Sequence, residues 1–184
     1  ELTIQEIYSK LIEDPIRNEL IIDDVVECHK NGRNSLVLTG RVAHVNTLSD
    51  MLKRKIPDVI SLTGGMGTKK TAEVMQKIAS VAENKPFVLV ATGSFIGEGF
   101  DESRLDTLFL AMPVAWKGTL QQYAGRLHRL HKKKKDVQIY DYIDIHVRML
   151  ERMYGKRLKG YSAIGYKAKV ENISDSPTDI IFDE

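Results

Sequence analysis

Five short apolar runs, separated by longer segments with helical periodicity, limit the fold of this sequence more than any other feature. The runs are rich in Val, Ile, Leu and Phe, which favours buried strands. Alternating strands and helices indicate right-handed crossovers and a mainly parallel sheet, with ligands at the carboxyl ends of the strands. We therefore expect an α/β domain with five or more strands flanked by helices. The predicted strands span residues 35–39, 58–62, 87–91, 106–111 and 137–142.

Three amphipathic segments predict helices around this sheet. Residues 69–82 place small and apolar side chains on one face. Residues 17–30 read as a helix that ends at Asn31-Gly32 and packs against the sheet. Residues 146–159 form a third helix, which we expect Gly160 to end.

These segments suggest three parts along the chain. Residues 1–33 form a helical segment that packs on, or links to, a preceding domain, and residues 34–169 form the main domain. Residues 170–184 contain Ser, Pro and Asp without periodicity, so we expect an acidic, mobile tail. The chain begins with Glu1 rather than Met, so we expect a piece of a longer protein.

Composition excludes several classes of protein. The chain has 184 residues and 42% hydrophobic content, enough for one buried core. Cys28 is the only cysteine, which excludes a disulfide framework and a cysteine zinc site, and we expect no metal site. No run of about 18 apolar residues occurs, so we expect a cytoplasmic protein without membrane contact. The net charge is only +2, but residues 132–135 are four lysines, either a nucleic-acid contact or a solvated turn.

A glycine-rich loop follows the third predicted strand. Three glycines between residues 93 and 99 allow the backbone to approach a ligand closely. Thr92 and Ser94 supply hydroxyl groups suited to a phosphate, and Asp101 supplies a carboxylate suited to a ribose hydroxyl. The alternative is a flexible connection in which Asp101 caps the turn at residues 102–104.

A second candidate segment covers residues 121–129. If it is helical, Gln122, Arg126 and Arg129 share one face, and the opposite face is apolar. Two guanidinium groups beside an amide suit a polyphosphate, or the carboxylates of a facing domain. The alternative is that this charged face is exposed to solvent and binds no ligand. The residues predicted to be buried are Leu120, Tyr123, Ala124 and Leu127.

Taken together, these segments resemble the motifs of a known family. Residues 88–101 resemble helicase motif V, and residues 122–129 (QYAGRLHR) resemble motif VI, in the expected order. Residues 35–41 resemble motif IV, and residues 62–65 resemble the strand end that follows it in helicases. The chain thus resembles the C-terminal RecA-like lobe of superfamily 2 (DEAD/DEAH) helicases, with features of the restriction-enzyme-type branch. The resemblance implies a three-layer RecA-like domain.

The resemblance also implies roles for individual residues. Arg126 and Arg129 would be arginine fingers, and Gln122 would sense the γ-phosphate. Gly99 would approach ATP and Asp101 would hold its ribose. The residues expected to contact a nucleic-acid backbone are Thr39, Gly40, Arg41, Thr63, Gly64, Thr92, Gly93 and Ser94.

The implied partners lie outside the chain. An N-terminal RecA-like lobe of the same polypeptide would supply most of the ligands of the Mg²⁺ ion that accompanies ATP. The nucleic acid would be DNA rather than RNA. The isolated chain would then be inactive, and the longer protein would be an ATP-dependent helicase. One alternative is a non-catalytic nucleic-acid-binding module. A Rossmann-like enzyme is a second alternative, but residues 40–44 lack its glycine fingerprint.

Overall fold

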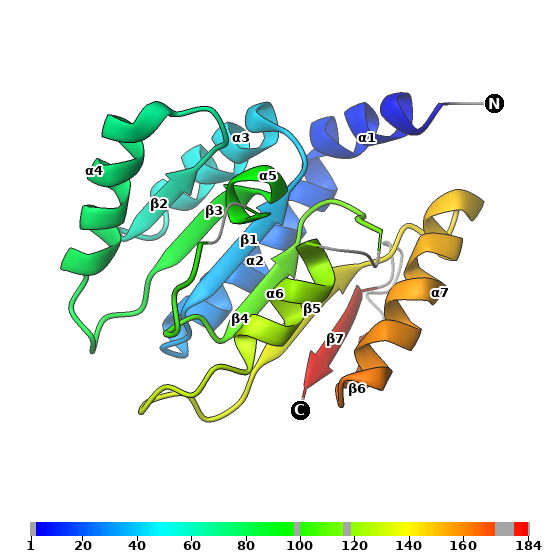
Figure 1. The fold of residues 1–184 in the computed structure, drawn as a ribbon. Coiled ribbons are helices and arrows are strands. Elements are labelled where there is room, and N and C mark those ends of the chain that lie inside the picture. The colour runs from blue at the N-terminus through cyan, green and yellow to red at the C-terminus, as the bar shows by residue number, and fades with distance from the viewer. Residues whose placement is uncertain (1–2, 98–99, 116–118, 172–178, 184) are drawn as a thin grey trace.

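The computed structural model describes residues 3–97, 100–115, 119–171 and 179–183. Within these residues one sheet of seven strands has the order β2-β3-β1-β4-β5-β7-β6 (Figure 1). The five strands from β2 to β5 are parallel, whereas β7 runs antiparallel to both β5 and β6. The strands are β1 (Ser35–Thr39), β2 (Val59–Leu62), β3 (Val88–Thr92), β4 (Thr107–Leu110), β5 (Gln138–Tyr142), β6 (Lys167–Glu171) and β7 (Asp179–Asp183).

Helices cover both faces of the sheet, as expected for a three-layer RecA-like domain. Successive strand residues point to opposite faces, so Leu36 and Leu38 belong to one core and Val37 to the other. On the Val37 side lie α2 (Pro15–Lys30) and α3 (Val42–Lys53). The other side carries α4 (Gly67–Ser80), α5 (Gly93–Gly97), α6 (Thr119–Leu127) and α7 (Arg148–Ala163) (Figure 1). The five predicted parallel strands and the fold class are confirmed.

The N-terminal helices are attached to this domain. The Asp14 side chain caps α2 by accepting from the backbone N–H groups of Ile16 and Arg17, at 3.0 and 3.2 Å. One face of α2 is buried against the sheet, as its periodicity predicts. The shorter α1 (Ile4–Glu13) packs through Ile7 and Leu11 in a separate small cluster. No helix among the described residues is both long and apolar enough to cross a membrane.

The prediction that Gly160 ends the last helix is wrong, because α7 continues to Ala163. Gly160 is buried, and Tyr161 beyond it is part of the core and donates to Asp141 at 3.1 Å. These tertiary contacts outweigh the weak helical preference of one glycine. The positive φ of 99° that follows the helix belongs to Gly165 instead.

The prediction of a mobile tail does not hold for residues 179–183, which form β7. The predicted boundary between residues 169 and 170 also falls inside β6. The outer edge of β5 presents backbone groups that require partners, and β7 supplies them through a ladder from Gln138 to Tyr142. Residues 179–183 (DIIFD) do not alternate polar and apolar side chains, so local pattern did not predict this pairing.

A buried ion pair holds α7 against β5. Arg157 donates to the two carboxylate oxygens of Asp141 at 2.7 and 2.8 Å, and both side chains are 1% exposed. Arg157 also donates to the carbonyl of Val114 at 3.0 Å. This arrangement fixes the orientation of α7 beside the parallel part of the sheet.

Candidate functional site

The candidate nucleic-acid contacts lie at the carboxyl ends of three neighbouring strands. Thr39 at the end of β1 is the register partner of Thr92 at the end of β3. Residues 63 and 64 follow β2, which is the next strand beyond β3. Parallel strands end at the same edge of a sheet, so the fold brings segments 39–41, 63–64 and 92–94 to one edge.

Gly64, Thr92 and Ser94 are in direct contact at this edge. The backbone N–H of Gly64 donates to the Thr92 hydroxyl at 3.2 Å, and that hydroxyl is 3.1 Å from the Ser94 hydroxyl. A Cβ atom on Gly64 would lie 2.7 Å from Ser94 Oγ, closer than normal contact. A larger residue at position 64 would therefore force the Ser94 hydroxyl to rotate away. Ser94 is exposed while Thr92 is buried, so Ser94 is the more accessible of the two residues.

Thr39 supports this edge of the sheet through buried contacts. Its side chain is buried, and its hydroxyl is 2.8 Å from Nδ1 of His44. The other ring nitrogen of His44 is 2.9 Å from the Asn18 side-chain oxygen on α2. Burial, followed by the charge of Arg17, lowers the pKa of His44 to about 4, so the ring is neutral at pH 7. The role of His44 could not be predicted from local pattern, because its link to Asn18 spans 26 residues.

Arg41 also has partners within the chain. Its guanidinium donates to the Ser9 hydroxyl at 2.8 Å and to the Gln5 side-chain oxygen at 2.7 Å, which ties α1 to the end of β1. The side chain is half-buried by these contacts, whereas Gly40 beside it is exposed. A ligand at this edge would therefore meet Gly40 before the Arg41 side chain.

The glycine-rich segment after β3 is partly helical. Residues 93–97 form α5, whose Phe95 and Ile96 are buried in the core. Gly99 lies outside the described residues. Asp101 is exposed and accepts a hydrogen bond from Arg129. It does not cap the turn that follows, since the backbone N–H of Arg104 donates to Glu102 instead, at 3.0 Å.

The predicted arginine face is built from a helix and the turn after it. Gln122 and Arg126 are on α6, but the helix ends at Leu127, so the expectation that Arg129 lies on the same helix is wrong. The early end has a physical cause, because Lys134 donates to the free carbonyl groups of Leu127 and Arg129 at 2.7 and 2.8 Å. The predicted buried face is confirmed for Leu120, Tyr123, Ala124 and Leu127.

The two candidate loops meet through three contacts. Arg126 donates to the carbonyl of Phe100 at 2.6 Å, and Arg129 pairs with Asp101. The buried hydroxyl of Tyr123 donates to the carbonyl of Ile96 at 2.6 Å and ties α6 to α5. Gln122 is exposed on the same helix, and its side chain makes no hydrogen bond to the other described residues. Two guanidinium groups and a carboxylate therefore share one surface, which suits the phosphate and ribose parts of a nucleotide.

No cluster of three or more His, Cys, Asp or Glu side chains that could hold a metal ion occurs in the described part of the chain. The carboxylate of Asp101 is paired with Arg129, so it is not positioned as a metal ligand.

Comparison with known proteins finds similar sequences. Residues 17–131 match the family described as helicase conserved C-terminal domain. Transcript termination protein A18 of Fowlpox virus (strain NVSL) is 27% identical over 147 residues, covering 79% of this chain and 31% of the relative. The ATP-dependent DNA helicase uvsW of Enterobacteria phage T4 is 26% identical over 128 residues, covering 70% of this chain and 25% of the relative.

A solved structure has the same fold. The crystal structure of T4 UvsW superimposes with a TM-score of 0.67 at 21% identity, over 88% of this chain and 35% of that protein. The chain spans about a third of the length of such relatives.

Proposed function

The chain belongs to the helicase conserved C-terminal domain family, and from this premise we propose that it is the second motor lobe of an ATP-dependent superfamily 2 helicase or translocase. One observation carries the proposal: the fold brings the half-buried Arg126 and the exposed Arg129 and Asp101 together beside α6. ATP binds between this surface and a first lobe of the same polypeptide. The first lobe supplies the phosphate-binding loop and most of the Mg²⁺ ligands.

In this proposal the two arginines act on the γ-phosphate. Both retain N–H groups beyond their present bonds to Phe100 and Asp101. Closure of the lobes brings these donors to the transferring phosphoryl group and stabilises its charge, with Gln122 beside them. Arginine fingers accelerate phosphoryl transfer by about 10³ to 10⁵. Asp101 accepts from the ribose hydroxyls once Arg129 has turned toward the phosphate. Gly99, outside the described residues, is the proposed backbone contact to the nucleotide.

The nucleic-acid strand lies across the carboxyl ends of β1, β3 and β2. Exposed Gly40 and Ser94, together with the half-buried Thr63, Gly64 and Gly93, present small side chains and backbone groups there. Such groups approach a phosphate backbone closely and position it without reading sequence. Thr39, Thr92 and Arg41 support this surface through their contacts with His44, Gly64 and α1.

We further propose DNA rather than RNA as the nucleic acid, a cytoplasmic location, and membership of the restriction-enzyme-type branch. The support for the branch is the sequence EGFD at residues 98–101, followed by LDTL at residues 105–108. A non-catalytic nucleic-acid-binding module is the alternative function, and an upstream phosphate-binding loop in the longer protein distinguishes the two.

The test is nucleic-acid-stimulated ATP hydrolysis by the longer protein with Arg126→Ala or Arg129→Ala. We expect each variant to lose stimulated hydrolysis while ATP binding is retained. Stimulation at the original level in both variants would refute the finger assignment. Residues 1–184 alone should not hydrolyse ATP, and vigorous hydrolysis by this chain would also contradict the proposal.

A further inference from the structure

A cavity of about 230 Å³ opens at the edge of the sheet opposite to the candidate nucleic-acid surface. Four segments line it, and each one immediately precedes a parallel strand: residues 32–34 before β1, 83–86 before β3, 104–106 before β4 and 131–134 before β5. It therefore lies at the amino ends of the strands. It shares no lining residue with the small hollow next to Arg126 and Asp101.

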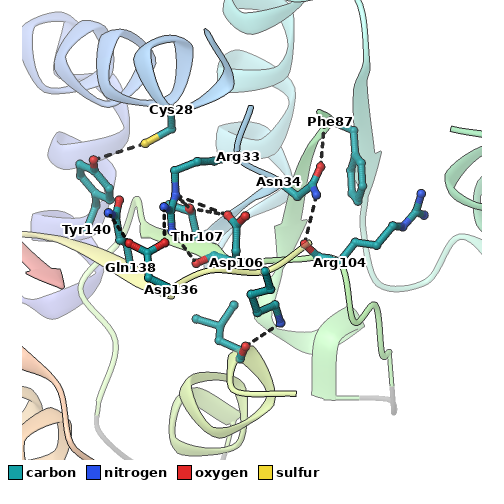
Figure 2. A network of polar contacts seen from close by, with 12 residues as sticks. Cys28, Arg33, Asn34, Phe87, Arg104, Asp106, Thr107, Asp136, Gln138 and Tyr140 are labelled. Carbon is teal, nitrogen blue, oxygen red and sulfur yellow. Dashed lines mark hydrogen bonds and ion pairs between the residues drawn. The ribbon is translucent and has the colours of Figure 1, made fainter. Parts of the chain in front are cut away.

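Two of the charges in this cavity are neutralised by fixed partners. Asp106 lies 3.5 Å from the guanidinium of Arg33 and accepts from the Thr107 hydroxyl at 2.8 Å (Figure 2). Arg104 is held by both carboxylate oxygens of Glu102, each at 2.8 Å. These pairs form a rigid floor without a large net charge.

Three ammonium groups remain, opposed by the carboxylate of Glu83. Lys85 makes no side-chain hydrogen bond or ion pair within the described residues, and Lys133 uses one N–H on the Glu83 carbonyl at 3.1 Å. Lys134 uses two N–H groups on the carbonyls of Leu127 and Arg129, which holds its ammonium in place and leaves a third N–H. Burial lowers the pKa of Lys134, so its charge is poorly solvated.

The floor adds neutral donors beside these cations. The Asn34 side-chain amide donates to the Arg104 carbonyl at 3.1 Å, and its oxygen accepts from the backbone N–H of Phe87 at 3.2 Å (Figure 2). The Asn34 amide is thereby fixed in orientation, with one N–H beyond that bond. Fixed donors around an excess of positive charge select a compact anion with several acceptor oxygens.

We propose that this cavity binds a phosphoryl group, and that Lys85, Lys133 and Lys134 are its charged contacts. The source of the phosphoryl group is either a free polyphosphate or the backbone of a nucleic acid, since both present the same oxygens. Two lysines of the run at residues 132–135, Lys133 and Lys134, thus line a specific cavity, beyond the solvated turn or extended contact that the sequence allowed.

The experiment is calorimetric titration of residues 1–184 with inorganic pyrophosphate. We expect saturable binding that weakens by about tenfold or more in the double variant Lys85→Gln/Lys133→Gln, because two charge-assisted contacts are lost. Lys134 stays unchanged in this variant, since its removal would also release the end of α6. The matched control is Lys53→Gln/Lys156→Gln, which removes the same charge from two exposed lysines outside the cavity and should keep the original affinity.

A third variant separates this cavity from the proposed ATP surface. Arg126→Gln should bind pyrophosphate as the unaltered chain does. Loss of binding in Arg126→Gln with retention in Lys85→Gln/Lys133→Gln would overturn the proposal and assign the anion to the ATP surface. Equal weakening in the cavity and control variants, or no saturable binding, would overturn it as well.

A short single-stranded oligonucleotide identifies the source. If the nucleic-acid backbone is the ligand, pyrophosphate competes with the oligonucleotide and the cavity variant weakens both. If a free polyphosphate is the ligand, the oligonucleotide binds the cavity variant unchanged while pyrophosphate binding is lost. Either pattern supports the phosphoryl site, and none of these measurements depends on ATP hydrolysis.

Discussion

Arg129 donates a hydrogen bond to the carboxylate of Asp101, so the proposed γ-phosphate ligand and the proposed ribose ligand are partners in the lobe on its own. Arg129 is 55% exposed and Asp101 38% exposed. An ion pair this accessible to water contributes little to stability. Breaking this ion pair to make contacts with a nucleotide would therefore lower the stability of the fold only slightly. A surface that opens and closes around a nucleotide requires such weak contacts.

Asp101→Asn tests this reasoning. The free energy of unfolding of the chain should change by less than about 1 kcal/mol, because the lost ion pair is solvated. In the longer protein, the KM for ATP should rise by about tenfold, because the ribose loses a charged acceptor. Urea unfolding measures the first effect and steady-state ATP hydrolysis the second.

Asp50→Asn is the control for this variant, since Asp50 is exposed on α3 and its substitution removes the same charge. It should leave both the unfolding free energy and the KM unchanged. A loss of stability well above 1 kcal/mol in Asp101→Asn would show that the pair is structural, contrary to its exposure.

Gly64→Ala should disturb the edge where β2 and β3 end. The new methyl group would lie 2.7 Å from Ser94 Oγ, so the Ser94 hydroxyl must rotate away from its place 3.1 Å from Thr92. We expect single-stranded DNA affinity to fall several-fold, with a stability loss of about 1 kcal/mol. Fluorescence anisotropy with a labelled oligonucleotide measures the first effect.

The double variant Gly64→Ala/Ser94→Ala supplies the control. Removal of the Ser94 hydroxyl relieves the close contact, so the double variant should regain the stability that Gly64→Ala loses. If the double variant is as unstable as the single one, the close contact with Ser94 is not the cause.

His44 should make stability depend on pH. Its pKa is about 4 in the folded chain, against the ordinary 6.5, so the unfolded chain binds the proton more readily. The stability that depends on a neutral His44 is fully present above the ordinary pKa of 6.5. It is lost as the pH falls toward the folded pKa of about 4. At about pH 5 this amounts to roughly 2 kcal/mol relative to neutral pH.

The measurement is urea unfolding of the unaltered chain and of His44→Gln, at about pH 7.5 and about pH 5. His44→Gln should show a smaller loss between the two pH values than the unaltered chain. His146→Gln, at an exposed histidine, should lose as much as the unaltered chain. An equal loss in the unaltered chain and His44→Gln would contradict the assignment.

Asp141→Asn should be strongly destabilising. The change leaves the guanidinium of Arg157, which is 1% exposed, without its charged partner. Removal of one member of a buried ion pair costs about 3 to 5 kcal/mol. Asp23→Asn, which breaks the exposed pair with Lys55, should cost less than about 1 kcal/mol, and urea unfolding compares the two. Similar losses of unfolding free energy in both variants would show that burial does not determine how much these ion pairs contribute to stability.

Much of the fold could be predicted from local pattern. The five parallel strands follow from short apolar runs and the apolar face of α6 from helical periodicity, and each segment carries its own pattern. The end of α6 could not be predicted in this way. It depends on Lys134, seven residues beyond Leu127, which reaches back to the last carbonyl groups.

The sequence by itself determined the alternation of strands and helices, and the presence of Arg126, Arg129 and Asp101 in segments that resemble helicase motifs. Only the tertiary structure decided which side chains meet. Asp101 and Arg129 are 28 residues apart, and His44 and Asn18 are 26 apart. Contacts of this kind depend on how helices and strands pack, whereas periodicity records only which face of each element is buried. For the same reason the amino-edge cavity, built by four separate segments, has no counterpart in any single stretch of the sequence.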